Sequence, residues 1–409
     1  MRNAAYGCAG TIPKTQVSNT VERDIAKGRE YWYRAEFENV AEIARVNKDT
    51  DAGKHLRGDL YAIQGSYQDA VDTYQQISSD YSEYRKVLRE MMNINAVHLK
   101  DIPKAKLLAA QLKSIVAELE DAEQAGLVYI NALSQPIEVV TKGTFVVPMD
   151  ISHPYNPYMP VIAGSVNGKK ESVLFDSGGN YLVITEKKAG ELGIEFDESH
   201  FFIGKQGHST SKMWVGVARS LKLGDELELE HVPVTILEEI NTNQELIIFG
   251  TTILKEFVTT IDGPNNQFIF TTRESKELVD AQLKKYQGNK MAFVMYGDHF
   301  MLGKGKYNGK DVNMFWDSGL VVVGVLNGKP AQAWLNVNKE AMEILGIEEE
   351  LNPTQVTATE DTLEFAGIVN KNALICGKPG KAYEWGGIRA DILVGYGIQK
   401  RFAWTIDFD

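Results

Sequence analysis

The spacing of apolar residues divides the chain into two parts. Over residues 21–133 apolar positions recur with helical periodicity, and the only proline is Pro103. From Thr141 onward, β-branched runs alternate with Asn-Gly pairs and single glycines, a pattern typical of strands and tight turns. Because Pro136 disfavours continuation of a helix, we expect the boundary between the two parts within residues 134–143.

The helical part repeats a short turn-and-helix frame. The clearest copy is residues 65–74 (GSYQDAVDTY), which has a small residue at a turn, an aromatic, a small residue where helices cross, and a second aromatic. One further copy begins at Lys100 and a weaker one at Ala35. The frame resembles the tetratricopeptide repeat, so we expect three helical hairpins and an extra helix within residues 119–133. Such an array is either a groove for a protein or peptide partner or a cap packed on the next domain.

The remainder of the chain contains one β pattern twice. Each copy has an Asn-Gly pair that predicts a type I′ hairpin turn, beginning at Asn167 and Asn308. Eight residues after each of these glycines, an apolar strand leads to Asp-Ser-Gly, at residues 176–178 and 317–319. A single Asp-Ser-Gly is a common turn triplet, but its duplication within a duplicated pattern indicates a site built from both copies.

The order of later features strengthens the duplication. Each copy continues with Leu-Gly-Ile at the end of a helical stretch, and then with an apolar strand that ends at Gly250 or Gly395. An Ile-Asp pair ends twelve residues beyond each of these two glycines. The second copy differs by 12 extra residues between its Asp and the glycine of its Leu-Gly-Ile. We therefore expect two similar β units, with an insertion in the second.

This double pattern resembles the aspartic peptidases, most closely the retropepsin-like bacterial aspartyl proteases. The resemblance covers about two thirds of the chain and implies an all-β fold of two barrel-like lobes related by pseudo-twofold symmetry, as in pepsin-type enzymes. The expected organisation is a flexible leader (1–20), a helical domain (21–135), lobe 1 (144–275), a linker helix (276–289) and lobe 2 (290–409).

The resemblance also implies that Asp176 and Asp317 meet in a cleft between the lobes. Two carboxylates held close together cannot both ionise cheaply, so they share a proton. The ionised carboxylate then takes a proton from a bound water while the protonated one donates to the substrate carbonyl, and neither role is assigned to one residue. In the family, the hydroxyls corresponding to Ser177 and Ser318 cross between the lobes and bond to the backbone of the opposite loop.

Further residues are expected to support this pair. Gly178 and Gly319 let the backbone approach the carboxylates closely. Asn180 can hydrogen-bond an aspartate oxygen. Gly250 and Gly395 would let a crossing strand pass beneath each loop.

The sequence departs from the family at three places. Val321 stands where a polar partner for Asp317 is usual, and Trp316 is unusually large for the residue before a catalytic aspartate. The flap of lobe 1 is expected around Gly207 and His208, without the tyrosine of pepsin-like flaps. His208 either contacts substrate or lies in a solvated loop.

Charge and composition exclude several classes of function. The formal net charge is −12 and there is no basic run, so we expect no nucleic-acid partner. The longest apolar run, residues 320–326, is far below the about 18 residues that a membrane helix needs. The seven histidines and two cysteines have no metal-ligand spacing, so no metal, cofactor or disulfide framework is expected.

The sequence therefore predicts an aspartic peptidase-like hydrolase that acts on a peptide or small-molecule substrate between its lobes. Two alternatives stay open: the pair catalyses acid/base chemistry on a non-peptide substrate (dehydration, cyclisation or hydrolysis), or the fold is a non-catalytic peptide-binding module. As numbered, the chain is expected to be soluble and cytoplasmic. It would be periplasmic or lipid-anchored if a signal sequence precedes Met1, since the stretch ending at Cys8 faintly resembles a lipoprotein signal.

Overall fold

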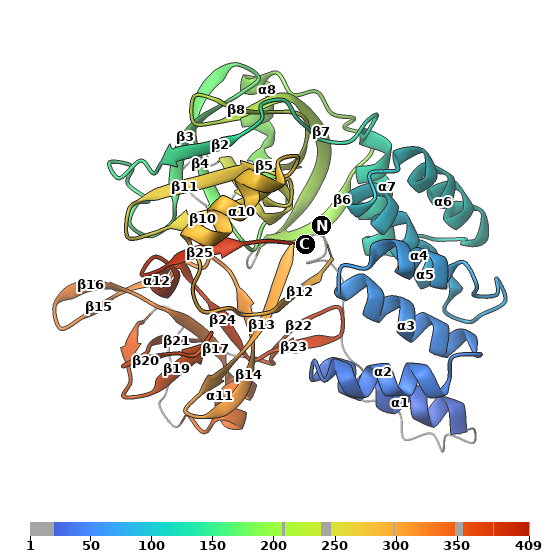
Figure 1. The fold of residues 1–409 in the computed structure, drawn as a ribbon. Coiled ribbons are helices and arrows are strands. Elements are labelled where there is room, and N and C mark those ends of the chain that lie inside the picture. The colour runs from blue at the N-terminus through green and yellow to red at the C-terminus, as the bar shows by residue number, and fades with distance from the viewer. Residues whose placement is uncertain are drawn as a thin grey trace.

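A computed structural model describes residues 20–206, 209–238, 247–297, 299–347, 355–378 and 380–408. A column of helices lies along one side of two β-rich units stacked on one another (Figure 1). The expected helical region followed by a β-rich region with barrel-like sheets is confirmed. Among the described helices, none is long and apolar enough to cross a membrane.

The helical region forms three hairpins and a closing helix. Its helices are α1 (Thr20–Tyr33), α2 (Phe37–Val46), α3 (Asp51–Ile63), α4 (Tyr67–Tyr74), α5 (Tyr84–Asn93) with the π-helical η1 (Ile94–His98), α6 (Ile102–Ile115) and α7 (Asp121–Ala132). The turn inside each hairpin has one residue in the left-handed region: Ala35 (φ 53°), Gly65 (φ 81°) and Lys100 (φ 57°). These are the first residues of the three repeat frames in the sequence.

Each frame places a buried residue at the same point of its second helix. Val40, Ala70 and Ala105 follow the turn residues by the same interval, and each is fully buried. Close helix crossings favour small side chains, and Gly58 shows how tight this array is. A Cβ on Gly58 would lie 2.3 Å from the ring of Tyr74. The repeated frame thus sets both the turn and the helix contact.

Lobe 1 is a strongly curved sheet with strand order β1-β8-β5-β9-β4-β3-β7-β6, and β7 also pairs with β8. Its elements are β1 (Glu138–Val139), β3 (Val161–Val166), β4 (Lys169–Asp176), β5 (Leu182–Thr185), α8 (Glu186–Leu192), β6 (Phe202–Gln206), β7 (Ser209–Leu223), β8 (Leu227–Leu237), β9 (Ile247–Gly250) and α9 (Thr251–Leu254). Because β1 pairs with β8, this sheet begins before Thr144, the expected start of lobe 1.

Lobe 2 repeats this arrangement after the linking helix α10 (Lys276–Lys285). Its strand order is β18-β21-β17-β24-β14-β13-β19-β20, with β12 paired to β13. Its elements are β12 (Phe293–Tyr296), β13 (Phe300–Tyr307), β14 (Lys310–Trp316), β15 (Val323–Leu326), β16 (Lys329–Gln332), β17 (Leu335–Asn338), α11 (Lys339–Leu345), β18 (Thr357–Ala358), β19 (Thr362–Phe365), β20 (Ile368–Lys371), β21 (Leu374–Lys378), β22 (Tyr383–Trp385), β23 (Ile388–Ala390), β24 (Ile392–Val394) and α12 (Tyr396–Gln399). The expected insertion is the separate hairpin β15–β16.

A third sheet joins the lobes. It has the order β2-β11-β10-β25 and consists of β2 (Thr144–Pro148), β10 (Phe257–Asp262), β11 (Gln267–Thr272) and β25 (Ala403–Ile406). Its register sets Thr259 opposite Ile406, so the C-terminal strand pairs with lobe 1 rather than with the lobe 2 sheet. Ile261 and Ile406, from the two Ile-Asp sequences, therefore lie in neighbouring strands of one sheet.

Local turn signals are borne out in both lobes. Asn167 (φ 51°) and Asn308 (φ 48°) have the left-handed conformation of type I′ hairpins, and each is followed by a glycine that is also left-handed. The glycines of the two Leu-Gly-Ile sequences cap helices in the same conformation: Gly193 ends α8 at φ 65° and Gly346 ends α11 at φ 74°. The two β units thus have their hairpin turns and helix ends at equivalent points.

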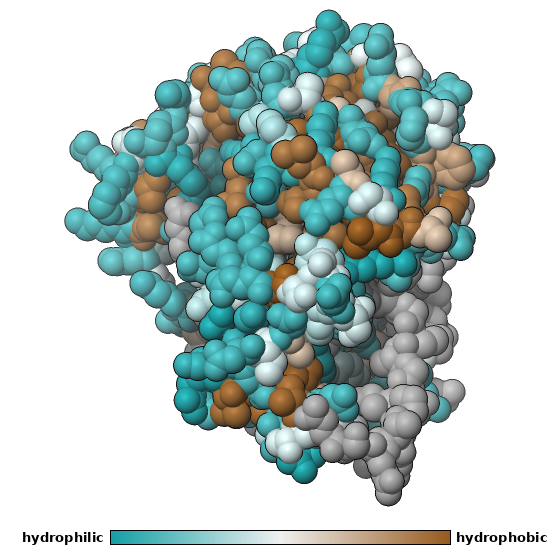
Figure 2. Space-filling view, turned by 90° about the vertical axis from the view of Figure 1, so that its right-hand side faces the viewer, coloured by the Kyte–Doolittle hydropathy of each residue, from teal (hydrophilic) through white to brown (hydrophobic). Residues whose placement is uncertain are grey.

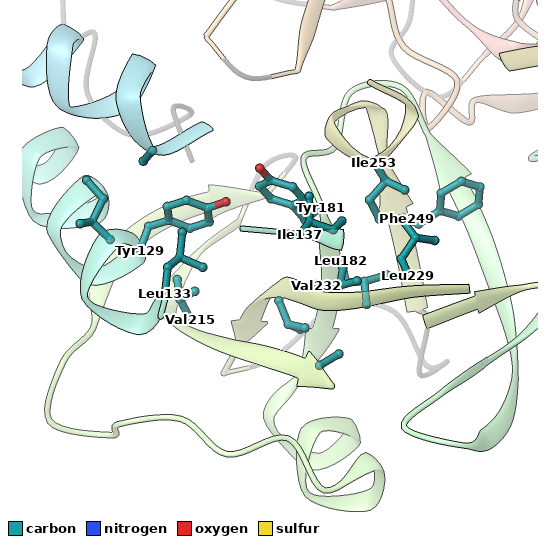
Figure 3. Packing of buried hydrophobic residues seen from close by; sticks show 14 of the residues in the cluster. Tyr129, Leu133, Ile137, Tyr181, Leu182, Val215, Leu229, Val232, Phe249 and Ile253 are labelled. Atoms are coloured by element: carbon teal, nitrogen blue, oxygen red, sulfur yellow. The ribbon is translucent and has the colours of Figure 1, made fainter. Parts of the chain in front are cut away.

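The helices share hydrophobic cores with both lobes, which the sequence did not predict. Trp32 and Leu56 belong to one cluster with Phe300 and Phe315 of lobe 2. A second cluster runs from α4–α7 into lobe 1, and Figure 3 shows Tyr129 and Leu133 packing towards lobe 1 residues such as Leu182 and Val232. The helical region therefore contributes buried residues to the hydrophobic cores of both lobes.

The side of the molecule that carries the helices is mostly hydrophilic, and most of its exposed hydrophobic residues (brown) lie in the upper half of the view (Figure 2). Exposed apolar side chains of the helical region include Val46, Leu107 and Ile115. Cys376 is a buried free thiol in β21, and Cys8 lies outside the described residues.

Candidate active site

The two Asp-Ser-Gly loops leave equivalent strands and face one another. Strand β4 ends at Asp176, which is in register with Gly250 at the end of the parallel strand β9. In lobe 2, β14 runs parallel to β24, and the Asp317 N–H donates to the Val394 carbonyl at 3.0 Å. Each aspartate is thus fixed by its own strand and by a partner strand beside it.

The glycines at the ends of β9 and β24 permit this packing. A Cβ on Gly250 would lie 2.0 Å from the carbonyl oxygen of Asn180, a distance that no side chain tolerates. The fit at Gly395 is less tight, since its Cβ would lie 3.1 Å from the carbonyl oxygen of Leu320. Next to Gly250, the Thr251 hydroxyl donates to the Ser177 carbonyl at 2.9 Å. This bond ties the Asp176 loop to the end of β9.

Ser177 and Ser318 join the loops by reciprocal hydrogen bonds. The N–H of each serine donates to the hydroxyl oxygen of the other, both at 2.8 Å. Each hydroxyl then donates onward across the interface: Ser177 to the Trp316 carbonyl at 2.9 Å, and Ser318 to the Phe175 carbonyl at 3.3 Å. Both side chains are buried, so these four bonds have no competition from solvent.

Glycine backbone also holds the first carboxylate. Asp176 Oδ1 accepts the Gly178 N–H at 2.7 Å from its own loop and the Gly319 N–H at 3.1 Å from the opposite loop. A Cβ on Gly319 would lie 2.3 Å from the Asp176 carboxyl carbon, and a Cβ on Gly178 would lie 2.9 Å from Asp317 Oδ1. The two glycines and the two carboxyl groups therefore occupy one compact cluster.

Burial raises the pKa of both carboxyl groups. For Asp317, burial is the largest cause, and the neighbouring Asp176 raises the pKa further, well above its ordinary value. For Asp176, burial raises the pKa, while the N–H of Gly178, the hydrogen bond with Asp317 and the N–H of Gly319 partly oppose that rise. This asymmetry favours the proton on Asp317 and the negative charge on Asp176.

Asn180 does not have the contact expected for it. The surroundings of Val321 and Trp316 account for two of the departures from the family pattern. The Asn180 amide donates to Thr235 Oγ1 at 3.5 Å and, within the described chain, has no bond to either carboxylate. Val321 packs in a small apolar cluster with Met159 and Leu174 of lobe 1. Trp316 is buried in the lobe 2 core, where the centroid of its ring lies 4.6 Å from that of Trp404.

Two residues of the site lack a signal in the sequence. His299, directly before β13, is buried, and its charge lowers the pKa of Asp176. Tyr181 follows the first loop, and its ring stacks on Tyr129 of α7 with centroids 5.8 Å apart (Figure 3). Both depend on contacts between distant segments, which spacing along the chain does not reveal.

Gly207 and His208, the flap candidates, lie outside the described residues. The hairpin that leads to them is described: β6 pairs with β7, and Gln124 of α7 donates to the Phe201 carbonyl at 3.2 Å. The β6–β7 hairpin is thus attached to the helical region at the start of β6.

Among the described residues, one group has three candidate metal-ligand atoms within 4.8 Å of one another: Glu138, Glu230 and His231. It lies on β1 and the paired strand β8, not on the loops that carry the aspartates. Exposed acidic groups of this kind are common without an ion, so the group gives no reason to assign a metal to the site.

Part of the chain is similar to known aspartyl proteases. Residues 162–253, from β3 to α9, match a family model described as aspartyl protease. No curated protein matches the chain. Among solved structures that match, a retropepsin-like aspartic protease from Rickettsia conorii has 16% sequence identity and a TM-score of 0.22, and the match covers 33% of this chain and 91% of that one.

Proposed function

We propose that the chain is an aspartic peptidase-like hydrolase in which Asp176 and Asp317 activate a water between two lobes. The observation that carries this proposal is the Gly319 N–H of one loop donating to the Asp176 carboxylate of the other at 3.1 Å. A purely structural pair of turns has no need for a backbone donor aimed at an acidic group of a distant segment. The aspartyl protease match over residues 162–253 supports the same assignment.

In the proposed mechanism, Asp176 is the ionised member of the pair in the resting state. Its Oδ1 accepts two N–H groups, which favour the charged form, whereas the pKa of Asp317 is raised well above its usual value by burial and by Asp176. Asp176 would draw a proton from the water while Asp317 donates to the substrate carbonyl oxygen. After the first proton transfer the roles exchange, so the titration belongs to the pair.

The reciprocal bonds of Ser177 and Ser318 serve this mechanism as positioning contacts. A shared proton requires a fixed separation of the two carboxyl groups, and misplacement of catalytic groups by about 1 Å costs about 10²-fold in rate. Buried bonds between the loops fix that separation without touching substrate.

We also propose a domain organisation. The helical repeats, which resemble tetratricopeptide repeats, form one domain up to α7, lobe 1 runs from β1 to β11, and lobe 2 follows α10. The three left-handed turn residues and the equally placed buried residues of the hairpins support the repeat assignment.

A peptide library cleaved by the full-length protein tests the function. We expect peptide cleavage fastest on the acid side of neutral, inhibition by pepstatin-type transition-state mimics, and retention of activity in a metal chelator. Mass spectrometry at several pH values identifies the bonds that are cut. Cleavage that is abolished by chelation, or that is unchanged in Asp176→Asn protein, would contradict the proposal.

A further inference from the structure

A cavity of about 580 Å³ lies between the helical domain and lobe 2. Its wall on the helical side includes Trp32, Tyr67 and Tyr129, and on the lobe 2 side it includes Tyr296 and Gly386. The lobe 2 residues belong to two hairpins, β12–β13 and β22–β23. We call this space the helical cavity; its volume is within the roughly 300–1,000 Å³ of ordinary ligand sites.

The helical cavity is bounded by segments that also hold the aspartate loops. Tyr129 lines the cavity and stacks on Tyr181, five residues after Asp176. Gly297 lines it in the same hairpin turn as His299, whose charge reaches Asp176. Both contacts lead from the cavity to the loop that carries Asp176.

Contacts on the lobe 2 side fix the cavity wall. The Trp32 indole N–H donates to the Gly386 carbonyl at 2.7 Å, and a Cβ on Gly386 would lie 1.8 Å from the ring of Tyr296. The hairpin β22–β23 leads directly into β24, which runs beside β14 and so beside Asp317. The hairpin β22–β23 thus contacts the helical domain through Gly386 and continues into the strand that lies beside the Asp317 strand.

The charges on the wall are balanced by local pairs. Arg29 pairs with Asp59 at 2.6 Å, Lys86 with Glu83 at 2.7 Å, and Arg89 with Glu90 at 3.3 Å, and all six side chains line the cavity. Such a wall has no excess charge for a phosphate or a nucleic acid, but it contains aromatic side chains and groups that can form hydrogen bonds. This chemistry suits an extended polypeptide, with its uncharged main chain and mixed side chains.

We infer that the helical cavity binds the segment of a polypeptide substrate that flanks the bond to be cut. This inference rests on the proposed hydrolase function and specifies its substrate class: unfolded or extended polypeptides long enough to reach from the aspartate loops into the helical domain. Short peptides would occupy only the loops and would gain nothing from the cavity.

Filling the cavity tests the inference. Ala62 of α3 and Ala122 of α7 line it without belonging to the aspartate loops, so Ala62→Trp and Ala122→Trp each occupy part of its volume. Ala110→Trp on the exposed side of α6 is the matched control. The probes are fluorescein-labelled casein, as a long unfolded chain, and a fluorogenic hexapeptide that contains a casein bond cut by the wild-type protein.

We expect both cavity variants to raise KM for casein at least about tenfold while kcat/KM for the hexapeptide stays within twofold of wild type. The control should change neither value, and circular dichroism checks that each variant is folded. Equal losses for both probes, or no loss for either, in a folded variant would overturn the inference.

Binding separates this inference from the hydrolase proposal. Asp176→Asn protein should bind labelled casein, measured by fluorescence anisotropy, and adding Ala62→Trp or Ala122→Trp should weaken that binding by a similar factor. If wild type cleaves neither probe but the binding result holds, the hydrolase proposal fails and the cavity assignment stands. Binding of casein that neither tryptophan affects would overturn the cavity assignment itself.

Discussion

At the scale of single residues, the carboxylates and the glycines around them form one unit. Gly178 and Gly319 are glycines because any side chain there would enter the space of the opposite carboxyl group. The close approach of the two Asp-Ser-Gly loops could be predicted from the sequence, since the triplet occurs twice. The bond from Asn180 to Thr235 could not, because it depends on where a distant strand lies.

Gly319→Ala should reduce activity by at least about 100-fold, because its methyl group would meet the Asp176 carboxyl group at 2.3 Å and shift it. The control is Gly190→Ala in α8, where a Cβ meets nothing within 4 Å. Alanine is favoured over glycine in a helix by up to about 1 kcal/mol, so the control should keep its activity with equal or higher stability. Turnover and thermal melting of both variants check this, and an active Gly319→Ala protein would refute the crowding argument.

Asp317→Asn should make the fold more stable at neutral pH than the wild type. The pKa of Asp317 is raised in the folded state, so the folded protein binds more protons than the unfolded chain above about pH 4. Wild-type stability therefore falls as pH rises from that value, and asparagine removes this loss. Each 1 kcal/mol corresponds to roughly 2 °C in melting temperature for a large domain.

The measurement is the melting temperature of wild type and Asp317→Asn at pH 4 and pH 7. The difference should be small at pH 4 and favour the variant at pH 7. Asp311→Asn, which removes an exposed carboxylate from the same strand, is the control and should show little difference at either pH. A variant less stable than wild type at pH 7 would contradict the raised pKa.

At the scale of elements, the two β units have the same strand-turn-strand pattern, with the same residue types at their hairpin turns and helix ends. Asn-Gly turns and glycine-capped helices have strong local signals, so these elements could be predicted from the sequence. For the hairpin β15–β16, the sequence predicted an insertion in the second unit but not that the insertion would form a hairpin. The pairing of β25 with β10 had no signal at all, because strand partners far apart in the chain are chosen by packing.

Ser318→Ala should loosen the link between the two loops. It removes the acceptor of the Ser177 N–H and the donor to the Phe175 carbonyl, both buried, and a buried unsatisfied group costs about 1–3 kcal/mol. We expect lower stability towards urea together with reduced turnover. Ser78→Ala, at an exposed turn, should change neither. Wild-type stability and activity in Ser318→Ala would show that the loops are held by other contacts.

At the scale of the whole molecule, the helical region shares hydrophobic cores with both lobes. Trp32 is buried among lobe 2 residues, and Lys100 pairs with Glu256 of lobe 1 at 2.7 Å. The boundary between helices and strands could be placed from composition and Pro136. The shared cores could not, because the same apolar helix faces are equally consistent with packing inside the array.

Trp32→Ala should destabilise the protein by about 3–5 kcal/mol, the usual cost of emptying a buried tryptophan site. It also leaves the Gly386 carbonyl without its indole donor. Leu107→Ala on the exposed face of α6 is the control and should cost little. For the same reason, a fragment that starts at Thr144 should be insoluble or much less stable than the full chain. A soluble fragment that melts like the full protein would contradict the shared cores.

The central claim is that the two aspartates act as one catalytic pair. Its most direct test is the rate of hydrolysis of one identified peptide by wild type, Asp176→Asn, Asp317→Asn, the double variant and Asp311→Asn, across pH 3–8. Each single variant should lose at least about 10³-fold, and the double variant should lose little more, because either change removes the shared proton. Asp311→Asn should follow the wild-type pH profile. Near wild-type turnover in either single variant, or losses that multiply in the double variant, would contradict the claim.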